Sequence, residues 1–413
     1  MSKASIYDRL QRRPPAPVEK PKVSTERSDF RRDRLRVIDG VALTPAGLVN
    51  SGVVPKKGSL EVQSERLGLD GFPLLGFSVQ NRVPAHPDDG SQPFRRDDKA
   101  LRLTELIQSL FIETMELLDN IPEHAGFDIV LVAPLRLQGA RDMVMQRLRD
   151  AVLGTEYGER LGALRYSDMG WDPHASLAVP EPGGMAYVLW ICADSVLNTE
   201  DLGQLQQRRL LASASQQEGV YPGEAVSALL FQRLLDEDCA EGSMASGWWL
   251  DNGAQQEHIA RHDRDRQARR QTIEEILDLA WPQRSKDDAK DHGTAMNDAV
   301  LASPAVVVVD ALTLPGRTVE VSSPLMERWQ RVNVVDDGIS VDGWCGWPGE
   351  ALTALQLVLA VASLAKMPEQ DALILNVAEE ERSRALVLRS TSGTDSSSQE
   401  AAVAASADTR IGS

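Results

Sequence analysis

Three uninterrupted apolar runs most constrain how this chain can fold. They are FDIVLVAP at 127–134, MAYVLWICAD at 185–194 and PAVVVVDAL at 304–312. A strand without polar alternation is typical of a sheet that is covered on both faces. Apolar residues with helical spacing occur at 103–118, before the first run, and at 141–153, between the first and second runs. Strands that alternate with helices predict an α/β architecture with mainly parallel sheets.

Further elements are predicted around this frame. LRVIDGVALTPAGL, from Leu35, predicts a short strand and a turn, and residues 350–366 predict a mostly apolar, internal helix. DALILNVA and RALVLRS predict a hairpin near the end of the chain. Residues 224–235 follow a Pro-Gly turn and predict a helix, and residues 254–285 predict a charged surface helix with a narrow apolar stripe.

The length of 413 residues allows two domains or one large duplicated α/β unit. The order of the elements permits two similar halves, at 35–245 and 246–390. Residues 1–34 are rich in Pro and Arg and predict a disordered basic arm, and residues 391–413 are rich in Ser, Ala and Thr and predict a disordered tail.

Charge and cysteine content limit the classes of partner and compartment. The formal net charge of -17 argues against nucleic acid as a general partner, because phosphate binding needs a positive field. Residues 1–36 hold eleven Lys/Arg and five Asp/Glu, so this arm is a solvated tail or reaches an acidic surface. Three cysteines suit a reducing compartment, and no run reaches the length of a membrane span. We expect a cytoplasmic protein that is not a membrane protein.

The string DHGTAMND at 291–298 resembles the His-Gly-Thr loop of β-ketoacyl synthases, the condensing enzymes of the thiolase-like class. Several weaker segments resemble the family in the same order. They are VIDGVALTPAGL, YVLWICADSVLN, GVYPGEAVSALLFQ, IEEILDLA and DGWCGWPGEALTALQLVLAVASL. The resemblance spans about residues 35–390 and implies a thiolase-like fold, with layers α/β/α/β/α and two pseudo-symmetric halves. It also implies a homodimer.

Condensing chemistry needs a thiolate at a helix N-terminus and two polar groups, usually His, beside it. By the resemblance, the nucleophile would precede the run at 185–194, where Ser167 and Ser176 are the only hydroxyls and no Cys occurs. Cys192 lies within that run and suits a buried thiol. Trp344 takes the place of the second family histidine, so His292 alone carries over, as a vestigial residue without a catalytic role.

Other residues have two interpretations each. Cys345 is a relocated nucleophile on a turn that opens a helix, or a packed thiol. Six residues of Gly-rich and aromatic segments are candidates for a former pocket or an interface. The alternative is that they belong to the core. They are Trp344, Cys345, Trp347, Trp248, Trp249 and Glu224. His258 and His262 are four apart, but their surroundings favour a solvated charged helix, and we expect no metal and no cofactor.

Three functions remain open. The resemblance favours a non-catalytic ketosynthase-like binding protein, similar to those of bacterial type VI secretion loci, which would be an adaptor or chaperone for an effector toxin or its spike-tip protein. The second is an active acyltransferase or condensing enzyme that uses Cys345 and His292. The third is a non-catalytic partner subunit of an active ketosynthase.

Overall fold

The computed structural model describes most of the chain. The described residues are 34–67, 71–80, 82–84, 98–178, 184–208, 210–212, 219–233, 247–251, 253–282 and 303–391. Nearly all of the predicted arm and tail, all of residues 85–97, Cys239 and His292 lie outside them.

The first half of the chain builds a five-stranded mixed sheet. In sequence its strands are β1 (Arg34–Thr44), β5 (Phe127–Val132), β6 (Leu161–Tyr166), β7 (Tyr187–Ser195) and β8 (Glu224–Arg233). Their order across the sheet is β6-β5-β7-β8-β1. β5, β6 and β7 are parallel, whereas β8 is antiparallel to both of its neighbours.

The second half repeats this connectivity. Its strands are β9 (Trp248–Asp251), β11 (Val306–Val309), β12 (Ile339–Ser340), β13 (Ala372–Asn376) and β14 (Arg382–Ser390). The order is β12-β11-β13-β14-β9, and the parallel and antiparallel pairs fall in the same places as in the first half. In both halves the strands therefore follow the order third, second, fourth, fifth, first, which confirms the predicted pseudo-symmetry.

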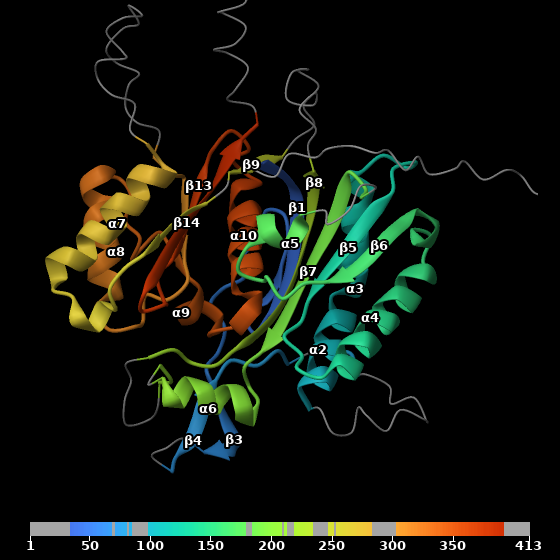
Figure 1. Ribbon diagram of the computed structural model, residues 1–413, viewed down its shortest axis with the longest axis horizontal. Coiled ribbons are helices and arrows are strands. Elements are labelled where there is room, and N and C mark those ends of the chain that lie inside the picture. The colour runs from blue at the N-terminus through green and yellow to red at the C-terminus, as the bar shows by residue number, and fades with distance from the viewer. Residues whose placement is uncertain are drawn as a thin grey trace, which may run out of the picture.

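Antiparallel pairing of β1 with β9 joins the two halves into one continuous sheet. Two short strands lie off this path: β2 (Gly47–Val49) pairs with β1, and β10 (Ala254–Glu257) pairs with β14. Figure 1 shows the second-half strands toward the left and the first-half strands toward the right, with a helix between them.

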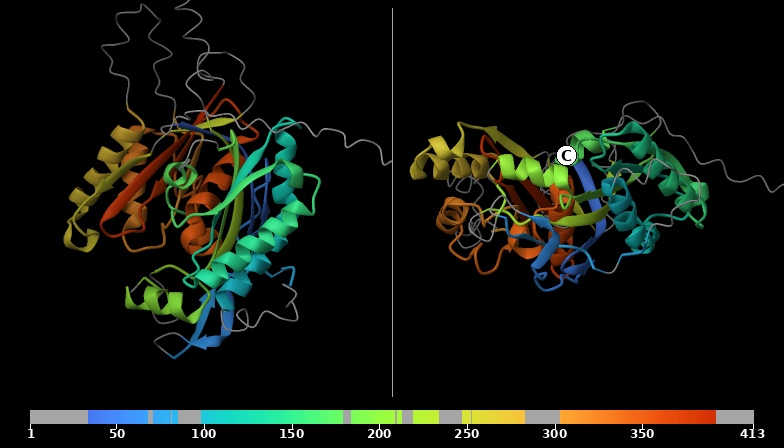
Figure 2. Two further views of the ribbon diagram at one scale, coloured as in Figure 1. Left: turned by 45° about the vertical axis from the view of Figure 1, so that its right-hand side comes forward. Right: turned by 90° about the horizontal axis from the view of Figure 1, so that it is seen from below.

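Helices cover the outer face of each half. On the first half they are α2 (Asp98–Ser109), α3 (Phe111–Glu116) and α4 (Gln138–Leu153). On the second half they are α7 (Arg266–Ala280) and α8 (Arg317–Arg328). Each outer layer has its own apolar core, and a third core fills the space between the two sheet halves. The result is the α/β/α/β/α layering that the resemblance implies (Figures 1 and 2).

The central layer differs most between the halves. Between its third and fourth strands, the second half has α10 (Leu352–Leu364), whose apolar residues contact both sheet halves. It is preceded by the short helices α9 (Val341–Cys345) and η6 (Gly349–Ala351). In the same place the described residues of the first half, 167–178 and 184–186, contain one short helix, α5 (Pro173–Leu177), of 5 residues.

One predicted helix is wrong, and a second is shorter than predicted. Residues 224–233 form the central strand β8, because pairing with both β1 and β7 outweighs the helical preference of its Ala and Leu residues. The charged segment at 254–285 begins as strand β10 and a 3-10 turn, η5 (Arg261–Asp263); its helix starts only at Arg266, after the N-cap Asp265. The predicted helix at 103–118 begins earlier, at Asp98, and is divided into α2, α3 and the 3-10 turn η2 (Leu117–Asn120).

A small subdomain lies below the carboxyl end of β7. It consists of the two-stranded sheet β3 (Glu61–Leu67) and β4 (Pro73–Gly76), together with α6 (Thr199–Gln207). Figure 1 shows these elements together at the bottom of the molecule, beneath the strand ends. The sequence predicted none of the three.

Candidate functional site

Glu224 is the first residue of β8 and has no exposed surface. Its carboxylate accepts hydrogen bonds from Arg102 Nε at 2.7 Å, from Arg102 Nη2, and from Ser195 Oγ at 2.9 Å. The backbone N–H of Val79 donates to Glu224 Oε1 at 2.7 Å. A buried carboxylate is tolerated only with such partners, so Glu224 anchors α2 and the 77–80 segment to the strand ends.

A second polar network lies beside Glu224. Lys99 Nζ is 2.8 Å from Asp194 Oδ1 and 2.5 Å from Asp201 Oδ2. Burial alone would lower the pKa of Lys99, but the two carboxylates raise it above its ordinary value. Asp194 Oδ2 also accepts the backbone N–H of Glu350 at 2.8 Å, at the entrance to the central helices. This network therefore connects α2 with the start of the η6–α10 segment.

The two described thiols are poorly suited to nucleophilic chemistry. Cys345 has no exposed surface and is the last residue of α9, so it is the packed thiol of the two predicted alternatives. Burial, with a further contribution from Asp342, raises the pKa of the Cys345 thiol well above its usual range. Burial and the charge of Glu350 likewise raise the pKa of Cys192. Neither side chain has the electropositive, accessible surroundings of a reactive cysteine.

The tryptophan pairs occupy separate places. Trp344 Nε1 donates a hydrogen bond to Pro55 O at 3.3 Å. The backbone of Trp347 forms an isolated parallel β-bridge with Pro222. Trp248 and Trp249 are instead buried strand residues of β9, paired with Val37 and Arg36 of β1. The predicted set of candidates therefore divides: Trp344, Cys345 and Trp347 are neighbours in sequence and space, while Trp248 and Trp249 stabilise the junction of the two sheet halves.

Polar contacts hold the segment around α5. Asp172 caps α5 by accepting the backbone N–H of Ala175, and Pro173 follows at the first helical position. Arg384 of β14 donates to Trp171 O and pairs with Asp172 Oδ1 at 3.2 Å. Ser176 is buried and accepts the indole N–H of Trp190 at 3.0 Å, so its hydroxyl has a structural partner.

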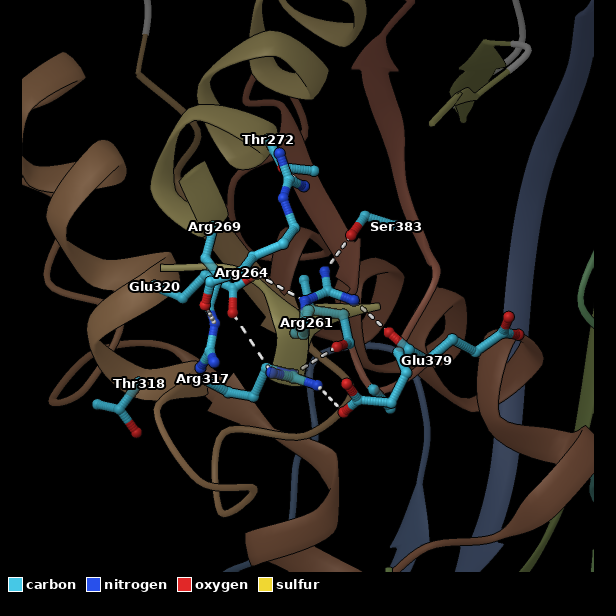
Figure 3. Close-up of polar contacts among 12 residues, drawn as sticks. Arg261, Arg264, Arg269, Thr272, Arg317, Thr318, Glu320, Glu379 and Ser383 are labelled. Atoms are coloured by element: carbon cyan, nitrogen blue, oxygen red, sulfur yellow. Dashed lines mark hydrogen bonds and ion pairs between the residues drawn. The ribbon is translucent and has the colours of Figure 1, made fainter. Parts of the chain in front are cut away.

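A cluster of buried charges lies in the second half, between α7, α8 and β14 (Figure 3). Arg261 Nε is 2.7 Å from Glu320 Oε1, and Arg261 also donates to Ser383 Oγ and Glu379 O. Arg317 pairs with Glu320 at 3.4 Å. Because these guanidinium groups are matched by acceptors, the cluster fixes the 258–264 segment against the terminal hairpin.

His258 belongs to this cluster and does not lie on a helix. Its Nε2 is 3.0 Å from Ser383 Oγ, and burial lowers its pKa. The side chain of His262 is outside the described part of the structure. Within the described ranges, no group of three or more His, Cys, Asp or Glu side chains is arranged to hold a metal ion. Among the same residues, no helix is both long and apolar enough to cross a lipid bilayer.

Comparison with known proteins identifies the fold. No protein-family model matches the sequence, and no curated protein matches it. Solved structures do match. A β-ketoacyl synthase from Burkholderia phymatum STM815 has a TM-score of 0.51 and 11% identity, covering 87% of this chain and 100% of that one. The AntDE:AntF complex, a type II PKS acyl-carrier protein with its ketosynthase bound to the hexaketide, gives a TM-score of 0.52 and 12% identity, with 87% and 100% coverage.

These likenesses confirm the predicted thiolase-like, ketosynthase-like fold. Of the predicted candidates, Glu224 lies in a polar network, and its partners Arg102, Ser195 and the neighbouring Lys99 were missed by the sequence analysis. A sequence signal for Asp194-Ser195 existed, since polar residues directly after a buried parallel strand often mark a site at the sheet edge. Nothing local marked Lys99 or Arg102, which lie half-buried in the first turns of α2.

Proposed function

We propose that this protein is a non-catalytic ketosynthase-like binding protein. The observation that carries the proposal is the five-residue helix α5, which stands where the second half has the 13-residue α10. A thiolate nucleophile gains stabilisation from the dipole of a regular helix whose first turn it occupies. Here the corresponding stretch, Ser167 to Ala178, contains no cysteine and is fastened by Asp172 and Arg384.

The state of the thiols supports the same proposal. The nucleophile of an acyl transfer must reach its thiolate form and contact an acyl thioester. Cys192 and Cys345 are both fully buried, and the pKa of each is raised. An active enzyme that uses Cys345 with His292 would have to expose this thiol and lower its pKa.

The finer assignment is an adaptor or chaperone role for a type VI secretion effector toxin or spike-tip protein. It rests on the resemblance to degenerate thiolase-like proteins of such loci, because a shared fold does not determine function. The expected partner is a protein, and we expect neither nucleic acid nor a membrane surface. A homodimer is expected from the resemblance to the thiolase-like class.

Covalent labelling tests the proposal. The native full-length chain is incubated with an acyl-thioester, and separately with iodoacetamide, and adducts are measured by intact mass and peptide mapping. We expect no acyl adduct at Cys345 or Cys192, and iodoacetamide labelling of both only after unfolding. Stoichiometric acylation at Cys345 that is lost in His292→Ala would overturn the proposal in favour of an enzyme.

Affinity purification from the native host, with the tag on the C-terminal tail, tests the adaptor role. Co-purification of a secreted toxin or a spike-tip protein is the expected result. Tight co-purification with a paralogue that retains the nucleophilic cysteine would favour the partner-subunit function instead. Deletion of residues 1–34 in the same experiment tests the basic arm, because unchanged recovery of the partner would exclude it as the recruiting segment.

A further inference from the structure

A polar cavity lies between the small subdomain, α2 and the residues that follow β7. Its volume is about 350 Å³, within the range of small-molecule sites. The lining residues come from four separate segments of the first half. They are Glu61, Val62, Gln63, Ser78, Arg82, Asp98, Lys99, Arg102, Ser195, Leu197 and Asn198.

Acidic side chains fix three basic residues of this lining, and within the described part of the chain each of the three keeps N–H donors that make no hydrogen bond. An arginine carries five N–H donors and a lysine ammonium three. Arg102 uses Nε and Nη2 on Glu224, and its Nη1 is 3.9 Å from Glu105. Lys99 has two acidic partners for its three donors.

Arg82 completes the basic side of the cavity. Its Nε donates to Val79 O at 3.0 Å and its Nη1 pairs with Glu105 Oε2 at 2.5 Å. Among the described residues no acceptor contacts its Nη2, which is therefore open to a ligand. The acids that hold the three cations are themselves buried or partly buried; Glu224 and Asp194 are 0% and 2% exposed. Side chains held in this way keep their orientation without a ligand, which lowers the cost of binding.

The carboxylate of Glu61 provides an acidic hydrogen-bond acceptor in the same cavity. It accepts hydrogen bonds from Ser78 Oγ at 2.8 Å and from Gln80 Nε2. Within the described residues no ion pair joins Glu61 to a basic side chain. A carboxylate offers about four acceptor positions, so Glu61 can still receive a hydroxyl or ammonium donor.

We propose that this cavity binds a small molecule with an oxyanion, either a carboxylate or a phosphate group, at one end and a hydroxyl or ammonium donor at the other. The oxyanion contacts Arg82, Arg102 and Lys99, and the donor contacts Glu61. Several carboxylates surround the cavity, so recognition depends on oriented hydrogen bonds, as guanidinium groups provide. The site uses no part of the condensing chemistry, and its failure would leave the proposed function unaffected.

Calorimetry and thermal unfolding of the full-length protein test this site. The probes are glycerol 3-phosphate and 3-hydroxybutyrate, which carry an oxyanion and a hydroxyl, with ethanolamine and potassium chloride as comparisons. We expect saturable binding and a raised melting temperature with at least one of the first two, and none with ethanolamine or the salt. The two oxyanion probes separate a phosphate from a carboxylate ligand.

Two variants connect binding to the proposed contacts. Arg82→Gln is expected to raise the dissociation constant roughly tenfold to a hundredfold, the usual loss for a charge-assisted hydrogen bond. Glu61→Gln is expected to reduce the preference for probes with a donor group over plain acetate or inorganic phosphate. Arg136→Gln removes an exposed arginine outside the cavity and is the matched control. The proposal is wrong if neither oxyanion probe binds, if ethanolamine binds instead, or if Arg82→Gln binds as tightly as the unchanged protein.

Discussion

The two halves of this protein fill the same topological position in opposite ways. In the second half, α10 packs almost entirely apolar side chains between the two sheet halves. In the first half, α5 is a capped turn held by Arg384 and by the hydrogen bond between Trp190 and Ser176. The segment between the third and fourth strands can thus be held in place either by buried apolar side chains or by polar contacts.

The largest expected effect is in α10. Leu355→Ala removes a fully buried side chain that contacts the central core, and we expect it to lower the free energy of unfolding by about 2–5 kcal/mol. Urea denaturation followed by circular dichroism measures the change. Leu137→Ala, at a residue that is 61% exposed, should leave stability unchanged. Equal losses in both variants would contradict a core centred on α10.

The next largest effect concerns the pKa of a buried carboxylate that follows a strand in each half, Asp310 in the second and Asp194 in the first. Asp310 follows β11 and accepts the backbone N–H groups of Val377, Ala378 and Ala311 at 2.7–2.9 Å. Burial nevertheless raises its pKa to about 6. In the first half, burial raises the pKa of Asp194 too, although Lys99 opposes the shift.

A raised carboxyl pKa has a defined effect on stability. Between about pH 4 and pH 6 the folded protein binds more protons at Asp310 than the unfolded chain does, so its contribution to stability falls as pH rises through this window. The wild-type free energy of unfolding should fall by about 2–3 kcal/mol relative to Asp310→Asn over that range. Denaturation at several pH values measures the difference. Parallel pH profiles would show that Asp310 titrates normally.

The smallest of the three effects concerns the polar contacts of α5. Arg384 is 6% exposed, and its guanidinium lies 5.3 Å from the centre of the Trp171 ring. Arg384→Met removes its hydrogen bonds to Trp171 and Asp172 and should cost about 1–3 kcal/mol, since Asp172 is partly exposed and can be hydrated. Arg382→Met is the matched control; this more exposed arginine also faces Trp171, at 5.7 Å, and should cost less than about 1 kcal/mol. If the two variants are equally stable, Arg384 does not hold α5.

Much of the fold could be predicted because its central strands are continuous apolar runs. Residues 127–132, 187–195 and 306–309 form strands as expected, and the terminal hairpin and the internal helix are also confirmed. The same continuity explains the error at 224–233, since a buried strand and a buried helix share an unbroken apolar pattern. Only the pairing with β1 and β7, which are distant in sequence, decides between them.

The candidate site was less predictable. Glu224 was selected from its sequence context, but its partners come from residues 122 and 29 positions away along the chain. Lys99 and Arg102 resemble ordinary surface residues at the start of an amphipathic helix, and only the tertiary structure places them over the strand ends. Two interpretations of Cys345 were open from the sequence, a relocated nucleophile on a turn or a packed thiol. The structure supports the packed thiol, because the central core encloses it.

The antiparallel pairing of β1 with β9 has a consequence for how the molecule can move. Backbone hydrogen bonds cross the boundary between the halves, and α10 packs against strands on both sides of it. Neither half can swing away from the other without breaking that ladder and exposing the shared interior. A pair of separately expressed halves would each present an uncovered apolar face, so we expect them to aggregate unless they are produced together. For this protein, the indivisible unit is the duplicated pair and not the single repeat.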